Sequence, residues 1–488
     1  MSRPNILLIL TDQQRWDSLG CYGTPGVHTP NLDQFAASGI RYDHCYVNNP
    51  LCTPSRASLW TGKHLPGHGV YALHDVLPQE EVLFPYRLRE MGYDTALFGK
   101  LHVAGHNFEK NHRHVYDGFN HYEWCPDPNG YRGDDNAYWR WLAIHHPDVL
   151  KRIDEHRGNV GHIPKEAHLT TWSANRTVDY LQSMVGTHRP FFCCMSVFDP
   201  HSPYTNYPRE YRDLLNQDAL PPIVGLDEPF DHRPIAHREE RSQKSGSFKA
   251  PEGLIESRIG YHAAIALIDE QVGRVLSALE STGFSENTIV IFVSDHGDML
   301  GDHGLTVKGC FMYDACTRVP LLIRNPHGPE GEVIASPCQL HDIAGTILSL
   351  AGCEEADIAD WMPDSRSLLA PESLETRGYA ACMHRNSGVG SNSYFNPPLH
   401  ATMWREGSYK LSVYHSPDPG SDHCPGELFH MEDDPDELNN LWDDPNHRNH
   451  RDSLILKLTN WLVRQETQGR ARGGQALPPN FGSAGSRQ

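Results

Sequence analysis

The residues that most clearly indicate chemistry lie between Leu51 and Gly62, a stretch that reads LCTPSRASLWTG. Pro54 favours the first turn of a helix because its ring fixes φ and it has no N–H to leave unpaired, and Gly62 favours the helix end. Cys52 would then lie at a helix N-terminus, where free N–H groups and the helix dipole favour an anion. Arg56 projects from the same face and offers a planar fork for an oxyanion. This combination suits the transfer of a sulfuryl or phosphoryl group.

Acidic residues follow two apolar runs that are typical of strands buried on both faces. Residues 5–10 lead to Asp12, and residues 288–293 lead to Asp295 and His296. Open α/β sheets bind ligands at the carboxyl ends of their strands, and carboxylate and imidazole groups are metal ligands. A lone Asp after a strand is more often a helix cap or a loop residue. Asp12 is nevertheless a candidate metal ligand, and the two strand ends would lie close together only in a doubly wound sheet.

A shorter apolar run, residues 94–99, ends in Lys100 and His102. A lysine can screen the negative charge of a transferred group, and a histidine can accept or donate a proton near neutral pH. Lysines and histidines in loops are usually only solvated. This pair therefore gains weight only together with the other motifs.

Taken in order, these motifs resemble those of the sulfatase family, which belongs to the alkaline phosphatase superfamily. The resemblance covers roughly residues 3–465. It rests on a Cys-x-Pro-Ser-Arg segment starting at Cys52, a Gly-Lys-x-His segment ending at His102, a Pro-His-x-Pro turn at His201, a Ser-Asp-His-Gly segment at Asp295 and a downstream lysine, Lys308.

The resemblance implies that the cysteine of the first motif is oxidised to formylglycine, whose hydrate supplies the nucleophilic hydroxyl. A formylglycine-generating or maturation enzyme is therefore an expected partner. The family also holds one divalent ion at the nucleophile. In this chain its ligands would be Asp12, Gln13, Cys52, Asp295 and His296.

The resemblance assigns roles to the remaining candidate residues. The charge on the sulfate would be neutralised by Arg56, Lys100 and Lys308. His201 would be the general acid that protonates the leaving oxygen. His102 would be the base that helps to expel sulfate and restore the aldehyde.

The identity of the metal follows less directly. The family usually binds calcium through oxygen ligands, including a second Asp after the first. Here Gln13 takes that place and brings no charge, and His296 brings a nitrogen. Imidazole and lower charge favour manganese or another transition ion. We expect Ca2+ first, with Mn2+ or Mg2+ as alternatives.

Two other functions are compatible with these residues. A phosphonate monoester or phosphodiester hydrolase of the same superfamily would use the same nucleophile, and Gln13 and His296 fit that branch too. Lys100 and His102 favour a sulfatase. A third possibility is a non-catalytic binding protein on this fold, in which Cys52 is never converted.

The substrate stays open among sulfated sugars, aryl sulfates and small alkyl sulfates. Two segments without clear periodicity, residues 104–165 and 204–251, are predicted as insertions that set specificity. Aromatic residues in the first insertion could stack on a sugar or aryl group. Neither segment contains a sequence motif that identifies a particular sulfate ester.

Composition narrows the class of protein further. The 42 Lys and Arg residues against 62 Asp and Glu give a net charge of −20, which disfavours a nucleic-acid-binding surface. Neither a signal peptide nor a membrane-spanning apolar run is recognised in the sequence. The twelve cysteines form no regular framework, so we expect reduced thiols and a cytoplasmic protein. A homo-oligomer remains possible.

These motifs require a particular set of elements to position them. We predict an α/β fold with a large doubly wound mixed sheet flanked by helices, like that of alkaline phosphatase. The predicted domains are a catalytic domain over residues 1–370 and a smaller C-terminal α+β domain over residues 371–468. Residues 469–488 are predicted to form a flexible tail.

Overall fold

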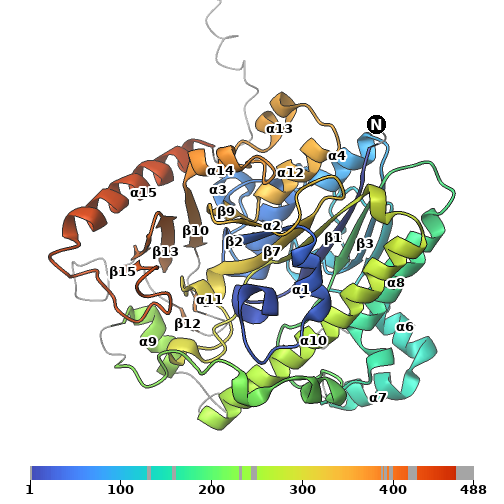
Figure 1. Ribbon diagram of the computed structural model, residues 1–488, viewed down its shortest axis with the longest axis horizontal. Coiled ribbons are helices and arrows are strands. Elements are labelled where there is room, and N and C mark those ends of the chain that lie inside the picture. Colours follow the sequence, from blue (N-terminus) through green and yellow to red (C-terminus); the bar gives the residue numbers. More distant parts are fainter. Residues whose placement is uncertain are drawn as a thin grey trace, which may run out of the picture.

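The computed structural model describes residues 3–128, 133–156, 161–229, 233–242, 250–385, 388–389, 393–394, 399–415 and 426–468. A large sheet carries helices on both faces, and a smaller antiparallel sheet lies beside it (Figure 1). The predicted tail of residues 469–488 lies outside the described residues. Across the described ranges, every helix is too short or too polar to cross a bilayer.

The central sheet is built around β1 (Asn5–Thr11), whose residues are all buried. This strand pairs in parallel with β5 (Phe191–Ser196) and β6 (Thr288–Ser294). The nine strands follow the order β4-β3-β5-β1-β6-β7-β2-β8, with β9 paired to β2. The remaining strands are β2 (Ile40–Tyr46), β3 (Asp94–Gly99), β4 (His121–Trp124), β7 (Arg318–Arg324), β8 (Glu332–Ile334) and β9 (Cys338–Gln339). Because β7 runs antiparallel to both β6 and β2, the predicted mixed sheet is confirmed.

Alternate residues of β1 face two different hydrophobic cores, which explains why its sequence is apolar throughout. Ile6, Leu8 and Leu10 belong to one core, and Leu7 and Ile9 belong to the other. Helices cover both faces of the sheet (Figure 1). The first core includes residues of α2 (Cys52–Thr61), α4 (Phe84–Glu90) and α12 (Asp342–Leu350), and the second includes residues of α1 (Pro30–Ala37), α8 (Leu169–Met184) and α10 (Pro251–Ser281).

The C-terminal sheet has four antiparallel strands in the order β10-β13-β14-β15. They are β10 (Tyr379–Arg385), β13 (His400–Glu406), β14 (Tyr409–Tyr414) and β15 (Gly426–His430), and α15 (Arg448–Gln468) follows them. The hairpin between β13 and β14 turns at Gly407, whose φ of +55° favours glycine. The smaller antiparallel sheet expected after the main domain is therefore present. The boundary near residue 370 stays a prediction.

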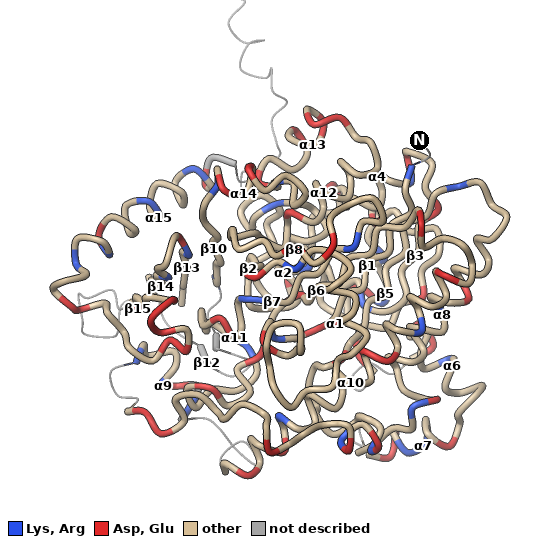
Figure 2. Tube along the Cα trace, in the orientation of Figure 1, with Lys and Arg blue, Asp and Glu red and all other residues tan. Residues whose placement is uncertain are grey.

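A buried ion-pair group connects the smaller sheet to α11 (Asp314–Thr317), the short helix that precedes β7. Lys410 on β14 is fully buried, and its Nζ lies 2.6 Å from Asp314 Oδ1 and 2.7 Å from Glu437 Oε1. Elsewhere Lys and Arg are scattered among Asp and Glu along the trace (Figure 2). The negative net charge is thus distributed over many elements.

The first predicted insertion is more ordered than its sequence suggests. Residues 104–165 include β4 and two nine-residue helices, α6 (Ala137–His145) and α7 (Pro147–Glu155). Helices this short leave little room for an apolar stripe to repeat, which is why the segment shows no clear periodicity. They pack around a small core of their own, which includes Tyr138 and Ile153.

Candidate active site

The nucleophile candidate lies at a helix N-terminus, as the sequence predicts. Helix α2 begins at Cys52 and follows the extended residue Leu51. It ends at Gly62, which adopts a left-handed φ of +68° and donates its N–H to Ser58 O at 2.9 Å. All residues of α2 are buried, because the helix packs against α4 and α12 and its apolar residues join the first core of the sheet.

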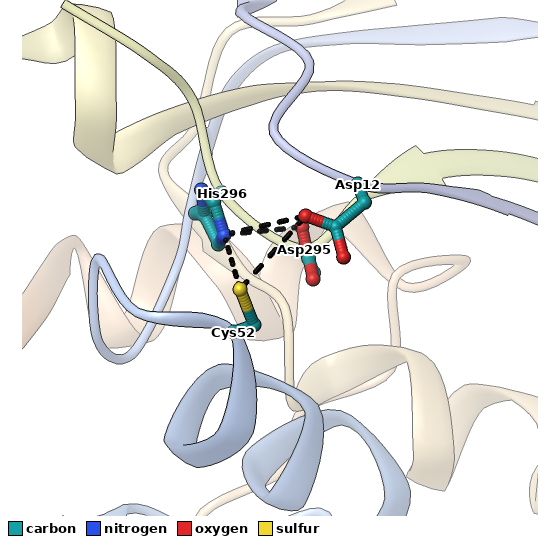
Figure 3. Close-up of side chains that lie close together, drawn as sticks. All are labelled: Asp12, Cys52, Asp295 and His296. Carbon is teal, nitrogen blue, oxygen red and sulfur yellow. Dashed lines mark hydrogen bonds and ion pairs between the residues drawn. The ribbon is translucent and has the colours of Figure 1, made fainter. Parts of the chain in front are cut away.

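Four ligand-bearing side chains converge at this point (Figure 3): one ligand atom from each of Asp12, Cys52, Asp295 and His296 lies within 4.8 Å of the others. Cys52 Sγ lies 3.1 Å from His296 Nε2 and 3.8 Å from Asp12 Oδ1. The convergence follows from the sheet. Strands β1 and β6 are parallel neighbours that pair up to Thr11, so the residues just beyond both strand ends meet.

The imidazole of His296 is oriented toward this cluster. Its Nδ1 lies 2.9 Å from the carbonyl oxygen of Gly297, which makes Nδ1 the donor and leaves the Nε2 lone pair facing Cys52. Burial alone would lower the pKa of His296, but Asp295 and Cys52 raise it above its usual value. Two carboxylates, an imidazole and a residue-52 heteroatom form a donor set that fits a divalent cation.

Arg56 holds the two carboxylates rather than lining the cavity. It is fully buried, with Nε 2.7 Å from Asp295 Oδ2 and Nη2 3.2 Å from Asp12 Oδ2. Its Nη1 donates to the carbonyl oxygen of Lys100 at 2.8 Å. Both carboxylates therefore turn their Oδ1 atoms toward the cluster. In the described structure the guanidinium meets these groups and Ser196, whereas the sequence suggests contact with a substrate oxyanion.

The charge around Cys52 favours an anion. Burial would raise the pKa of its thiol, but the positive charges of Lys100, Lys308 and His296 hold it well below its usual value. Lys100 Nζ also lies 2.5 Å from Asp12 Oδ2. The floor of the site thus combines two carboxylates with nearby cations, a balance suited to binding both a metal and an anionic group.

A cavity of about 690 Å3 opens above the cluster. The predicted site residues that line it are Gln13, Cys52, Lys100, His102, His201 and Lys308. Lys308 Nζ lies 2.6 Å from His201 Nε2. These two side chains are more than a hundred residues apart in the sequence but face the same part of the cavity. His102 Nε2 lies 3.1 Å from Thr53 Oγ1, and burial lowers the pKa of His102 to about 3.

The cavity wall also contains residues that sequence reasoning did not single out. His74, His106, Phe108 and Asp127 line it, and three of them come from the first insertion. No motif marks them, because their spacing resembles that of ordinary loop residues. Within its described part, the second insertion, residues 204–251, contributes nothing to this wall.

Two further residues, Tyr204 and Asp298, contact Gln13 but do not line the cavity. Tyr204 OH lies 3.2 Å from Gln13 Nε2, and both groups donate to Asp298 Oδ2. Asp298 is not among the residues that the sequence analysis singles out. Its position three residues after Asp295 was the available signal, because both follow the same strand end. Gln13, expected as a metal ligand, accepts a hydrogen bond from Lys308 through Oε1.

Comparisons with known proteins agree with this geometry. A family model described as "Sulfatase" matches residues 4–353. The uncharacterised sulfatase YidJ of Escherichia coli is 31% identical over 462 residues, covering 91% of this chain and 84% of the relative. An arylsulfatase of Clostridium perfringens is 29% identical over 498 residues and covers 96% of each chain. The crystal structure of a phosphonate monoester hydrolase from Agrobacterium radiobacter has a TM-score of 0.75 at 23% identity, covering 95% of this chain and 96% of that chain.

The fold has an alkaline-phosphatase-like architecture, and the matching family model and relatives make the protein a hydrolase. The chain belongs to the sulfatase family.

Proposed function

We propose that this protein hydrolyses sulfate monoesters through a formylglycine made from Cys52. The observation that carries the proposal is the convergence of Cys52 with Asp12, Asp295 and His296 beneath a cavity that two lysines line. A buried helix N-terminus with flanking cations is an environment that stabilises an anion during group transfer. The hydrolase class follows from the family, and the sulfate ester and the converted cysteine are the proposed part.

In the proposed reaction, a hydroxyl of the hydrated residue 52 attacks sulfur and the S–O bond to the leaving group breaks. Lys100 and Lys308 line the cavity where the sulfate oxygens would lie. His201 Nδ1 lies 2.8 Å from Ser202 O, so its Nε2 accepts a hydrogen bond from Lys308. The Lys308–His201 pair thus supplies the proton for the leaving oxygen. The second hydroxyl of residue 52 then expels sulfate and restores the aldehyde, with His102 as the candidate base.

A divalent cation would be held by Asp12, Asp295, His296 and residue 52, and it would lower the pKa of the nucleophilic hydroxyl. The nitrogen ligand supports manganese, and resemblance to the family supports calcium. Arg56 supports this assignment because it positions both carboxylates without occupying the ligand face. The residues present therefore fit an ion of either kind.

The leaving group is proposed to be an aryl or a saccharide unit. A cavity of about 690 Å3 is large enough for either class. The similarity to an arylsulfatase supports the aryl class, and the Phe108 and Phe198 side chains on the wall support stacking on a ring. A maturation enzyme that oxidises Cys52 is the protein partner that this function needs.

A second candidate function is phosphonate monoester or phosphodiester hydrolysis. The observation that favours it is the pair formed by Gln13 and His296, which replaces a carboxylate and an oxygen ligand by neutral groups. This lowers the negative charge near the nucleophile and suits a manganese ion. Lys100 and His102 in the same cavity support the sulfatase instead.

The deciding experiment compares turnover of an aryl sulfate and an aryl phosphonate monoester on one batch of enzyme. The aldehyde content at residue 52 is measured first by peptide mass. A preference of several orders of magnitude in kcat/KM for the sulfate supports the proposal, and the reverse preference establishes the second candidate. Activity on neither substrate, with aldehyde present and metal bound, would contradict both.

A further inference from the structure

Gln13 adopts a backbone conformation that is unfavourable for a residue with a side chain. Its φ is +68°, and it is fully buried. The backbone N–H of Gln13 donates to Asp295 Oδ1 at 3.0 Å, and its carbonyl oxygen accepts from Tyr261 OH at 2.7 Å. Such a conformation persists only where its surroundings fix it, and it concentrates at functional sites.

The side chain of Gln13 is held at both ends of its amide. Nε2 donates to Asp298 Oδ2 and lies 3.2 Å from Tyr204 OH, and Oε1 accepts from Lys308 Nζ. A carboxylate can only accept a hydrogen bond and an ammonium can only donate one. These two partners therefore determine which way the amide points.

Asp298 anchors this arrangement from the interior. It is fully buried, and its Oδ2 accepts from both Gln13 Nε2 and Tyr204 OH. Its Oδ1 accepts from the backbone N–H of Leu300 at 2.8 Å. With donors on both oxygens, the carboxylate cannot rotate without losing a hydrogen bond, so it presents a fixed acceptor to Gln13.

The arrangement ends at the groups that face the substrate. Lys308 donates to Gln13 Oε1 and also lies 2.6 Å from His201 Nε2. Lys308, His201 and Gln13 all line the cavity above Cys52, whereas Asp298 and Tyr204 do not. Two buried residues are thus linked to a cavity cation by hydrogen bonds through one intervening amide.

We propose that Asp298 and Tyr204 are positioning residues that act through the amide of Gln13. Their role is to hold the ammonium of Lys308 against His201, in line for protonation of the leaving oxygen. This inference rests on the proposed function, in which that pair supplies the proton. It also gives the side chain of Gln13 a role on the leaving-group side of the site.

The expected signature depends on the leaving group. A basic leaving oxygen needs a proton in the transition state more than an acidic one does, so misplacing the donor costs more with poor leaving groups. Removing the hydroxyl of Tyr204 takes one donor from Asp298 and one polar neighbour from Gln13. The amide of Gln13 can then rotate, and the hydrogen bond between Lys308 and His201 forms in a smaller fraction of molecules. A general structural defect would instead lower turnover of every substrate by the same factor.

The test measures kcat/KM of Tyr204→Phe across aryl sulfates whose phenols span a wide range of pKa. We expect a loss of about tenfold with unsubstituted phenyl sulfate, the cost of one hydrogen bond, and much less with 4-nitrophenyl sulfate. Metal content should match that of the wild type. Tyr211→Phe is the matched control, because it removes a hydroxyl that bonds Glu270 away from the cavity.

A double-mutant cycle with Lys308→Ala identifies the route of the effect. If Tyr204 acts through Lys308, its replacement adds little once the lysine is gone, and Asp298→Asn should behave in the same way. Equal losses for all leaving groups, or additive losses in the cycle, would overturn the positioning role alone. A wild-type enzyme with full aldehyde content that hydrolysed none of these sulfates would overturn the proposed function as well.

Discussion

Arg56 Nε lies 2.7 Å from Asp295 Oδ2, and both side chains are fully buried. The same guanidinium reaches Asp12 Oδ2 at 3.2 Å. One planar group therefore fixes two carboxylates that come from different strands, and it leaves their other oxygens facing Cys52 and His296. This positions the ligand face of the cluster before any cation binds.

Arg56→Lys tests this arrangement because it keeps the charge and removes the planar fork. A single ammonium cannot bridge both carboxylates. We expect kcat/KM to fall by about a hundredfold or more, since small misplacements of reacting groups have effects of that size. The free energy of unfolding should fall by about 2 kcal/mol, because a hydrogen bond between buried charged groups is lost while the charge is kept. Urea unfolding and steady-state kinetics measure both.

The matched control for this change is Arg87→Lys. Arg87 forms a surface pair with Glu90, whose side chain is half exposed. Such pairs contribute little to stability, so the control should change the free energy of unfolding by less than about 0.5 kcal/mol. Similar losses in both variants would show that Arg56 has no special part in the cluster.

Cys52→Ala should abolish turnover of any ester that the wild type hydrolyses. The variant lacks the thiol that is oxidised to give the aldehyde, and water alone cannot replace a nucleophile at a buried helix N-terminus. Turnover and the mass of the peptide across residue 52 are measured on the same batches. Cys353→Ala, at a partly exposed free cysteine, should leave both unchanged. Substantial activity in Cys52→Ala would contradict the covalent route.

The outcome of sequence reasoning differed between the cluster and the cavity wall. Asp12 and Asp295 could be predicted because both follow apolar strands, and strand ends meet at one edge of a parallel sheet. Cys52 could be placed because the residues after it start a helix. Side-chain partners carry no such periodic signal. The side chain of Arg56 points toward the carboxylates and that of Gln13 points toward Lys308. Both orientations depend on partners hundreds of positions away in the sequence.

The same limit applies to the wall of the cavity. His106 and Asp127 reach it because short helices and loops of the first insertion fold over Cys52. The ring of His106 packs against that of His102 at a centroid distance of 4.4 Å, and the longer helices of the insertion pack around Tyr138 and Ile153, so no local pattern marks these positions. Sequence therefore identifies the candidate reacting groups more readily than the residues of the cavity wall.

Acidification should destabilise the protein through its buried neutral histidines. Burial, together with Lys63, lowers the pKa of His68 to about 3. Its Nδ1 accepts from Val70 N–H at 3.1 Å, and its Nε2 lies 2.9 Å from Ser58 Oγ, so the neutral ring satisfies both contacts. An unfolded histidine titrates near pH 6.5. Between that pH and about 3 the unfolded state binds more protons, so stability falls as pH falls.

His68→Gln measures this contribution. Between pH 7 and pH 5 the single histidine should account for about 2 kcal/mol of lost stability, which glutamine removes because it does not titrate. The variant's free energy of unfolding should therefore depend less steeply on pH, whatever its value at pH 7. His112→Gln, at an exposed position, should keep the wild-type slope. Equal slopes in the two variants would show that His68 is not the titrating group.

The choice of metal should depend on His296. Its Nδ1 is occupied by the Gly297 carbonyl, so Nε2 is the nitrogen that faces Asp12 and Cys52. His296→Asn replaces that nitrogen by an amide oxygen. Imidazole favours manganese over calcium, so affinity for Mn2+ should fall by about tenfold or more while affinity for Ca2+ changes much less. Titration calorimetry on chelator-treated protein measures both ions. The matched control is His201→Asn. His201 lines the same cavity but does not belong to the cluster, so this change should alter neither the Mn2+ nor the Ca2+ affinity. Equal losses for both ions in His296→Asn would mean that the imidazole does not set the metal preference.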